Sequence, residues 1–408
     1  MTVYIVAAIL ISVQQTSFGT HVFNYPKHDP PLDGIIDKPE TVALFAGQPM
    51  TDYNNYRIFK FSFGHLVQGK DLYGVYPGEH WDFYKYSPTF ALLMGAIAWL
   101  PDVAGLSVWN LLNALALFFA IRKLPFSVTA QCLLLWFIAN DLFGCFANAQ
   151  SNGIMAGLVI AAYVCMQGGK PMWATLWLVL ATFIKVYGAI GFCLFLFYPD
   201  KVKFILYAAM WTIIFAALPL LVTPFSTLTW QYHSWLALMK ADASTTGTGL
   251  SVAGWLQTWF GLNNVKSYVT MIGMVLFVLP FARFRLYRHE LFKLLVVASM
   301  LIWVIVFNHK AESPTYVIAV AGVGIWYFAM PRAGWRTALL FVTLVFTSLS
   351  TTDLFPPAVR TAFIYPYDIK AVPCIIVWFV VFAELMLLKP GKTGVKAEYA
   401  ETGEEFRK

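Results

Sequence analysis

Residues 204–223 read FILYAAMWTIIFAALPLLVT and contain no charged side chain. About 20 such residues in a helix are enough to cross the hydrocarbon core of a bilayer. The same character extends along the chain, because 59% of its 408 residues are hydrophobic and only 12% are charged. A soluble domain is about 25% charged. The sequence therefore predicts a single all-α, polytopic membrane domain.

Similar apolar runs recur along the chain, near residues 2–18, 88–100, 103–121, 127–146, 151–167, 171–185, 187–199, 265–281, 291–308, 314–330, 336–350 and 371–388. The runs at 88–100, 171–185 and 187–199 are short, so we expect broken or tilted helices that face protein or a cavity. About eleven to thirteen transmembrane helices are expected. They would form a domain over residues 1–390, followed by a disordered cytoplasmic tail at 391–408.

Lysine and arginine predict how the chain is oriented. The net charge is +7, but the basic residues are scattered between apolar runs, which is not typical of a nucleic-acid-binding surface. Basic clusters mark cytoplasmic loops. The clusters are Arg122-Lys123, Lys170, Lys201/Lys203, Arg283/Arg285/Arg288, Arg332/Arg336 and Lys389/Lys392/Lys396. The outer side then receives residues 19–86, 147–152, 224–263, 308–313 and 351–370, together with Lys185.

One region leaves two topologies open. The runs between Pro88 and Ile121 should return the chain to the side that it left, yet Arg122-Lys123 requires the opposite side. Either residues 88–100 are re-entrant and break at Pro101-Asp102, or Arg122-Lys123 violates the charge rule.

The first outer loop, residues 19–86, combines acids, bases and aromatic residues. Its three polar segments are Thr51-Asp52-Tyr53-Asn54-Asn55-Tyr56-Arg57, Gly69-Lys70-Asp71-Leu72-Tyr73 and Tyr84-Lys85-Tyr86-Ser87-Pro88. A carboxylate on this face could take a proton from an acceptor hydroxyl, and cations could stabilise a departing phosphate. A membrane anchor or a plain channel needs no such loop. The pattern favours transfer from a lipid-phosphate donor, with short amphipathic helices in the loop.

These segments, in this order, resemble the first-loop signature of polyprenol-phosphate-dependent GT-C glycosyltransferases, above all glycosyltransferase family 87. Three later segments extend the resemblance. They are Asn148-Ala149-Gln150-Ser151-Asn152, similar to a G-Q-x-N motif at a helix start, Phe183-Ile184-Lys185-Val186-Tyr187, similar to K-x-x-P, and the late loop Asn308-His309-Lys310-Ala311-Glu312-Ser313-Pro314. Gly188 stands where the family has proline, and the first loop lacks an Asp-x-Asp motif, so no metal is implied.

The resemblance implies a GT-C-like helical bundle in a bacterial inner membrane, with its active site on the extracytoplasmic face. It implies an inverting transfer of a hexose, with mannose expected, from a polyprenyl-phosphate sugar to a glycan or lipid-linked acceptor. Asp52 is the expected catalytic base. The residues expected to bind donor or substrate are Arg57, Lys85, Tyr86, Gln150, Asn152, Lys185, His309 and Glu312. The expected partners are membrane lipid, the donor and the acceptor, without nucleic acid or a further cofactor.

Other interpretations remain open from the sequence. Asp52 or Thr51 could cap a helix, and Lys185 could extend to the membrane interface. Tyr86 could belong to an interfacial aromatic belt, Arg57 could bind lipid headgroups, and His309 with Glu312 could order a loop. For the whole chain, the alternative is a secondary transporter or flippase for a lipid-linked or anionic solute. A third interpretation is that the protein is a catalytically inactive family member with a scaffolding role.

Overall fold

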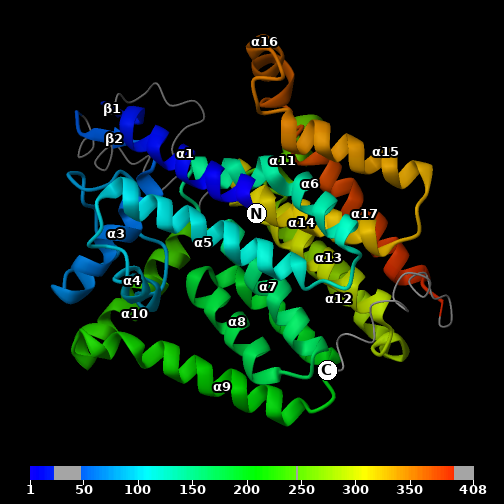
Figure 1. Cartoon of the computed structure of the whole chain (residues 1–408), viewed down its shortest axis with the longest axis horizontal. Coiled ribbons are helices and arrows are strands. Elements are labelled where there is room, and N and C mark those ends of the chain that lie inside the picture. Colours follow the sequence, from blue (N-terminus) through cyan, green and yellow to red (C-terminus); the bar gives the residue numbers. More distant parts are fainter. Residues whose placement is uncertain (23–46, 245–246, 390–408) are drawn as a thin grey trace.

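The computed structural model describes residues 1–22, 47–244 and 247–389. The predicted tail at 391–408 and residues 23–46 of the first outer loop lie outside these ranges. The described chain is almost entirely helical (Figure 1). It also has one antiparallel pair of short strands, β1 (Thr20–Val22) and β2 (Pro49–Thr51), in which Thr20 pairs with Thr51. The predicted all-α class is confirmed.

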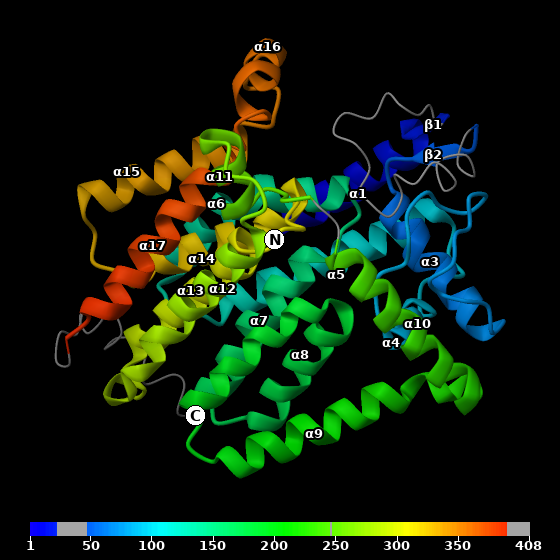
Figure 2. The ribbon, with the colours of Figure 1, turned by 180° about the vertical axis from the view of Figure 1, so that it is seen from behind.

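The longer elements form the bundle, seen from two sides in Figures 1 and 2. They are α1 (Thr2–Phe18), α5 (Asp102–Arg122), α6 (Val128–Ala147), α7 (Asn152–Gln167), α8 (Pro171–Ile184), η1 (Val186–Phe197), α9 (Lys201–Ala217), α10 (Phe225–Ala243), α12 (Lys266–Val278), α13 (Glu290–Val306), α14 (Tyr316–Ala329), α15 (Gly334–Thr343) and α17 (Val372–Leu387). The shorter ones are α3 (Asn54–Val67), α4 (Pro88–Met94), η2 (Leu218–Leu221), α11 (Val252–Phe260), η3 (Leu279–Ala282), η4 (Phe284–Leu286), η5 (Ser313–Thr315), the π-helical η6 (Leu344–Leu349), α16 (Pro357–Val359) and the π-helical η7 (Arg360–Ile364).

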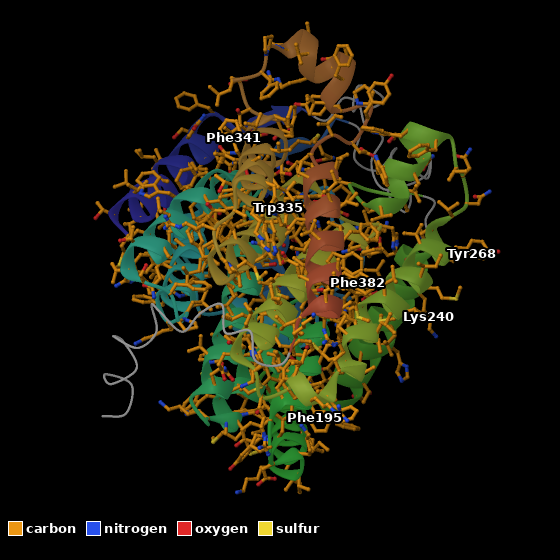
Figure 3. The ribbon with its side chains drawn as sticks, turned by 90° about the vertical axis from the view of Figure 1, so that its right-hand side faces the viewer. Phe195, Lys240, Tyr268, Trp335, Phe341 and Phe382 are labelled. Atoms are coloured by element: carbon orange, nitrogen blue, oxygen red, sulfur yellow. The ribbon has the colours of Figure 1, made fainter. Side chains whose placement is uncertain are left out.

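The surface of the bundle is apolar, as expected for a protein whose solvent is lipid. Within the described ranges, three helical stretches are long and apolar enough to cross a membrane by themselves: Asp102–Arg122, Val128–Ala147 and Lys201–Leu221. Large side chains such as Tyr268 of α12 and Phe341 of α15 project outward (Figure 3) and are 65% and 64% exposed. In contrast, α13 and α14 are buried along most of their length and form the centre. The chain is a polytopic membrane protein.

Loops that the basic clusters assign to one side lie together at one end of the bundle. Three hydrogen bonds join the outer loops: Asn55 to the Asn148 carbonyl, Asn152 to the Pro314 carbonyl, and the Leu250 amide to the Ala311 carbonyl. Contacts at the other end join Lys293 to Gln167 and Arg283 to the Leu385 carbonyl. The arrangement agrees with the alternation that the basic clusters predict.

The structure favours the re-entrant alternative for residues 88–100. α4 spans seven residues and is followed by turns up to Leu100, so this segment is too short to cross a bilayer. Lys60 of α3 donates to the Leu100 carbonyl (2.9 Å) and to Asp102 Oδ1 (2.6 Å). Because α3 lies in the predicted first outer loop, this contact places the start of α5 on the same side of the bundle as that loop. Arg122-Lys123 then obeys the charge rule.

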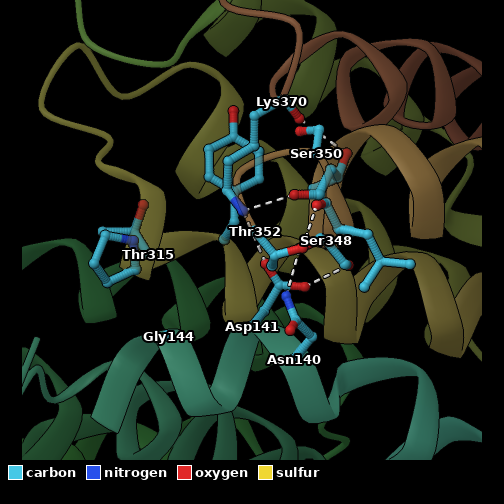
Figure 4. Close-up of polar contacts among 12 residues, drawn as sticks. Asn140, Asp141, Gly144, Thr315, Ser348, Ser350, Thr352 and Lys370 are labelled. Carbon is cyan, nitrogen blue, oxygen red and sulfur yellow. Dashed lines mark hydrogen bonds and ion pairs between the residues drawn. The ribbon is translucent and has the colours of Figure 1, made fainter. Parts of the chain in front are cut away.

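A buried polar junction, which the sequence analysis did not single out, joins the C-terminal helices to α6 (Figure 4). Lys370 Nζ lies 3.1 Å from Asp141 Oδ1 and donates to the Thr347 carbonyl (2.7 Å). The Ser348 hydroxyl donates to the other oxygen of Asp141. Asp141 and Lys370 are each 3% exposed. An ion pair in such a place is stable only when both charges are paired and hydrogen-bonded.

We predict that Lys370→Met lowers the thermal unfolding temperature of the detergent-solubilised protein. The substitution leaves the Asp141 carboxylate buried without its cation, and such a loss costs about 3–5 kcal/mol. Lys203→Met, which breaks the exposed pair with Asp200, is the control and should leave the unfolding temperature nearly unchanged. Equal unfolding temperatures for both variants would contradict this account.

Candidate active site

An interruption between α8 and η1 positions the central cation of the site. α8 ends at Ile184, η1 begins at Val186, and Lys185 between them is extended, with φ −138° and ψ 125°. The chain then turns back closely, because a Cβ on Gly188 would lie 2.6 Å from the carbonyl carbon of Ala181. Glycine is therefore required where the family resemblance led us to expect proline. The interruption places Lys185 at the tip of a hairpin formed by α8 and η1.

Neutral hydrogen-bond acceptors and aromatic rings hold the Lys185 ammonium, and the charge of the Glu312 carboxylate also acts on it. Its Nζ donates to Gln150 Oε1 (3.1 Å) and to Asn152 Oδ1 (2.8 Å). It also lies 5.9 Å from the ring centre of Tyr86 and 5.7 Å from that of Tyr187, within the range of cation–π attraction. The amides and rings orient the ammonium group without themselves carrying a charge.

The two amides connect Lys185 to the late loop. Gln150 Nε2 donates to Glu312 Oε2 (3.3 Å), so the side chain of Gln150 bridges a cation and a carboxylate. Asn152 donates to the Pro314 carbonyl (3.0 Å), and its Oδ1 also accepts from the Tyr187 hydroxyl (3.1 Å).

The structure thus brings together five of the residues expected to bind substrate. With Tyr187, they form the Lys185 cluster: Tyr86, Gln150, Asn152, Lys185, Tyr187 and Glu312. Tyr187 was absent from the predicted site, although it lies in the quoted segment around Lys185.

The Tyr84–Pro88 segment holds Tyr86 against the cluster. Ser87 is the N-cap of α4, where its Oγ accepts from the Phe90 amide (3.1 Å), and Pro88 occupies the first helical position. The same hydroxyl donates to the Phe183 carbonyl at the end of α8 (2.5 Å). One serine therefore starts the re-entrant segment and attaches it beside the interruption at Lys185.

Asp52 lies in the turn between β2 and α3, and its side chain is exposed. Its amide donates to the Gly19 carbonyl (2.8 Å). Tyr53, not Asp52 or Thr51, is the N-cap of α3, so the structure does not support the capping interpretation. Asn55, three residues further on, donates to the carbonyl of Asn148, two residues before Gln150. The turn that holds Asp52 therefore adjoins residues 148–150, which lead into the Lys185 cluster.

Arg57 and His309 lie in different surroundings. Arg57 Nε donates to the Glu79 carbonyl (2.6 Å), and its guanidinium lies 5.3 Å from the Phe61 ring, so these contacts stay within the first outer loop. The carbonyl of His309 packs against Gly249, which has φ +52° and where a Cβ would lie 2.7 Å from that oxygen. His309 thus belongs to the contact between the late loop and the segment after α10.

A second charged group adjoins the Lys185 cluster. Asp242 Oδ1 lies 3.4 Å from Lys85 Nζ and 3.4 Å from Lys310 Nζ, and Lys85 Nζ is 3.7 Å from Asp82 Oδ1. We call these four residues the Asp242 group. Lys85 precedes Tyr86, which is part of the Lys185 cluster. Of the four, only Lys85 was predicted as a site residue. Nothing in the sequence distinguishes Asp242, a single acid near the end of a helix.

Residues 83–307 match the family model of glycosyltransferase family 87, which is more than half of the chain. The chain belongs to glycosyltransferase family 87. The matched span contains the Lys185 cluster apart from Glu312, and Asp52 precedes it. No curated protein matches the chain. Membership of family 87 makes the protein a glycosyltransferase and favours this over the transporter or flippase.

The described ranges contain no group of three His, Cys, Asp or Glu side chains placed to hold a metal ion. Beside the Lys185 cluster of this family 87 glycosyltransferase, Lys85 and Lys310 pair with the Asp242 carboxylate.

We predict that acidification destabilises the first outer loop through His80. Burial lowers the pKa of His80 from 6.5 to about 4, and burial also lowers that of His65, against the opposing charge of Glu79. The unfolded chain therefore binds more protons, and stability is lost as the pH falls from about 6.5 towards 4, by at most about 3 kcal/mol for His80. Thermal unfolding between pH 7.5 and 4.5 measures the effect.

His80→Gln should flatten this pH dependence, while the same change at the exposed His233 is the control. An unchanged slope in His80→Gln would show that His80 is not the source.

Proposed function

We propose that the protein is an inverting GT-C-type glycosyltransferase of a bacterial inner membrane. It transfers a hexose, with mannose preferred, from a polyprenyl-phosphate sugar to an extracytoplasmic glycan or lipid-linked acceptor. The observation that carries the proposal is the position of Lys185. A cation at an interrupted helix, held by neutral amides among the outer loops of a family 87 protein, is suited to binding a lipid-linked phosphate.

In the proposed reaction, Asp52 takes the proton of the acceptor hydroxyl, whose oxygen attacks the anomeric carbon. The bond from that carbon to the phosphate oxygen breaks, and its electron pair leaves with the polyprenyl phosphate. A phosphate is a weak base and needs no acid beside it, but its growing charge is stabilised by a fixed cation. We assign this role to Lys185. The exposure of Asp52 leaves its carboxylate accessible to a large acceptor.

The neighbours of Lys185 prepare it for this role. Gln150 and Asn152 accept two of its three possible hydrogen bonds, which leaves the third N–H for a phosphate oxygen. Tyr86 and Tyr187 cover the ammonium with ring faces and limit the water around it. In less polar surroundings, the attraction between ammonium and phosphate is stronger than in water.

We predict that Asp52→Asn abolishes sugar transfer from labelled polyprenyl-phosphate mannose in membranes that contain the protein. Loss of a general base lowers the rate by about 10²–10⁴. Asp71→Asn is the matched control in the same loop, since asparagine keeps the oxygen that accepts from the Tyr73 amide. Full activity of Asp52→Asn would overturn the mechanism, and an unmodified acceptor with translocated donor would favour the flippase.

We predict that Lys185→Met reduces kcat/KM for the donor by about 10² or more, because a charge-assisted contact to the phosphate is lost. KM for the acceptor should change little. Lys70→Met, at an exposed lysine of the first outer loop, is the control. A Lys185→Met enzyme with wild-type kcat/KM for the donor would exclude the proposed phosphate contact.

A further inference from the structure

We propose that Lys85 and Lys310 form an anion-binding subsite that Asp242 of α10 occupies until a phosphate group displaces it. The identification of this phosphate as that of the sugar donor rests on the proposed function. The inference adds to that function a carboxylate, Asp242, that competes with the donor phosphate for the two lysines.

Asp242 is placed to serve two cations at once. Its Oδ1 lies 3.4 Å from both Lys85 Nζ and Lys310 Nζ. These lysines come from the first outer loop and the late loop, which are far apart in the sequence. Strong charge-assisted hydrogen bonds are about 2.7–2.9 Å long. At 3.4 Å a single oxygen attracts both ammonium groups electrostatically, whereas a phosphate could present a separate oxygen to each.

The position of Asp242 on its helix supports a role outside the helix itself. Asp242 precedes Ala243, the last residue of α10. The helix dipole disfavours an acid in the last turn. The carboxylate is therefore not there to stabilise α10, and the two lysines are the groups that it stabilises.

α10 is anchored unevenly. Gln231 is fully buried, donates to the Lys70 carbonyl (2.6 Å) and accepts from the Leu72 amide (3.1 Å). Trp235 donates to the Lys85 carbonyl (3.2 Å). Beyond Trp235 the residues of α10 are half-buried or exposed, and the hydrogen bond from Lys266 to the Ala243 carbonyl (2.9 Å) would have to follow or break if this end moved. The last turns can therefore shift at a small loss of buried contacts, while the first turns stay in place.

The charges fit a singly charged phosphodiester. The Lys185 cluster and the Asp242 group contain three lysines and three carboxylates: Lys85, Lys185 and Lys310 with Asp82, Asp242 and Glu312. A phosphodiester carries one negative charge, so it can replace Asp242 without changing the sum. A phosphate monoester, the product of sugar transfer, carries about −1.5 to −2 at pH 7. With Asp242 displaced, the lysines outnumber the remaining carboxylates by one, so a monoester is attracted to the subsite as well and can serve as its probe.

The test measures binding of two probes, farnesyl phosphate and inorganic phosphate, to the full-length protein in detergent by microscale thermophoresis. Asp242→Asn should tighten binding of farnesyl phosphate by about fivefold or more, because a competing charge is removed. Lys310→Gln should weaken it by a similar factor. Asp353→Asn, which breaks the remote pair with Arg360, is the control and should leave the affinity unchanged.

Each outcome decides the proposal. Unchanged or weaker binding in Asp242→Asn overturns it, and Asp242→Ser provides the same test if the first variant does not fold. Inorganic phosphate bound as tightly as farnesyl phosphate would identify free phosphate as the ligand of the same subsite.

The binding assay is independent of sugar transfer. Tighter binding in Asp242→Asn without any transfer from polyprenyl-phosphate mannose would overturn the proposed function and leave the subsite. Normal sugar transfer, together with unchanged binding of farnesyl phosphate in Asp242→Asn, would overturn the subsite and leave the proposed function.

Discussion

The candidate active site depends on how the chain satisfies its backbone at the interruption between α8 and η1. In apolar surroundings, an unbonded backbone group costs several kcal/mol, so a helix can break only where other groups replace its hydrogen bonds. Here the Lys185 amide still donates to Ala181 (2.9 Å), the Gly188 amide donates to the Lys185 carbonyl (2.8 Å), and Ser87 bonds the Phe183 carbonyl. The re-entrant segment thus helps to satisfy the backbone, because Ser87 at its start donates a hydrogen bond to a carbonyl at the end of α8.

This arrangement explains why the cation Lys85, the aromatic Tyr86 and the capping residue Ser87 are consecutive in the sequence. Ser87 must reach the end of α8, and the preceding residue, Tyr86, is then brought beside Lys185. Lys85, one residue earlier, reaches Asp242. On the other side, Asn152 uses both ends of its amide in three hydrogen bonds, which fixes Lys185 and Tyr187 relative to the late loop. A site held by such supporting contacts keeps its geometry without a ligand.

Much of the fold and of the candidate site could be predicted from the sequence. The remaining features could not be predicted, for identifiable physical reasons. Hydropathy and charge alternation predict the class and the loops that meet, and motif order predicts Gln150, Asn152 and Lys185 as one group. The sequence left two topologies open at residues 88–100, and the contact from Lys60 to Asp102 decides between them. Asp141 lies inside an apolar run, where an acid requires a partner. That partner, Lys370, is 229 residues away, and nothing local indicates it.

The turn at residues 148–150 connects the parts of the site that lie outside the family match. Ala149 has φ +50°, a left-handed conformation that costs a non-glycine residue about 1 kcal/mol or more. Trp109 donates to its carbonyl (3.0 Å), Asn55 of the first outer loop bonds Asn148, and Gln150 bonds Glu312 of the late loop. The strained turn persists because these contacts hold it from three sides. Relaxing it would move the Asp52 turn and Glu312 relative to Lys185 at the same time.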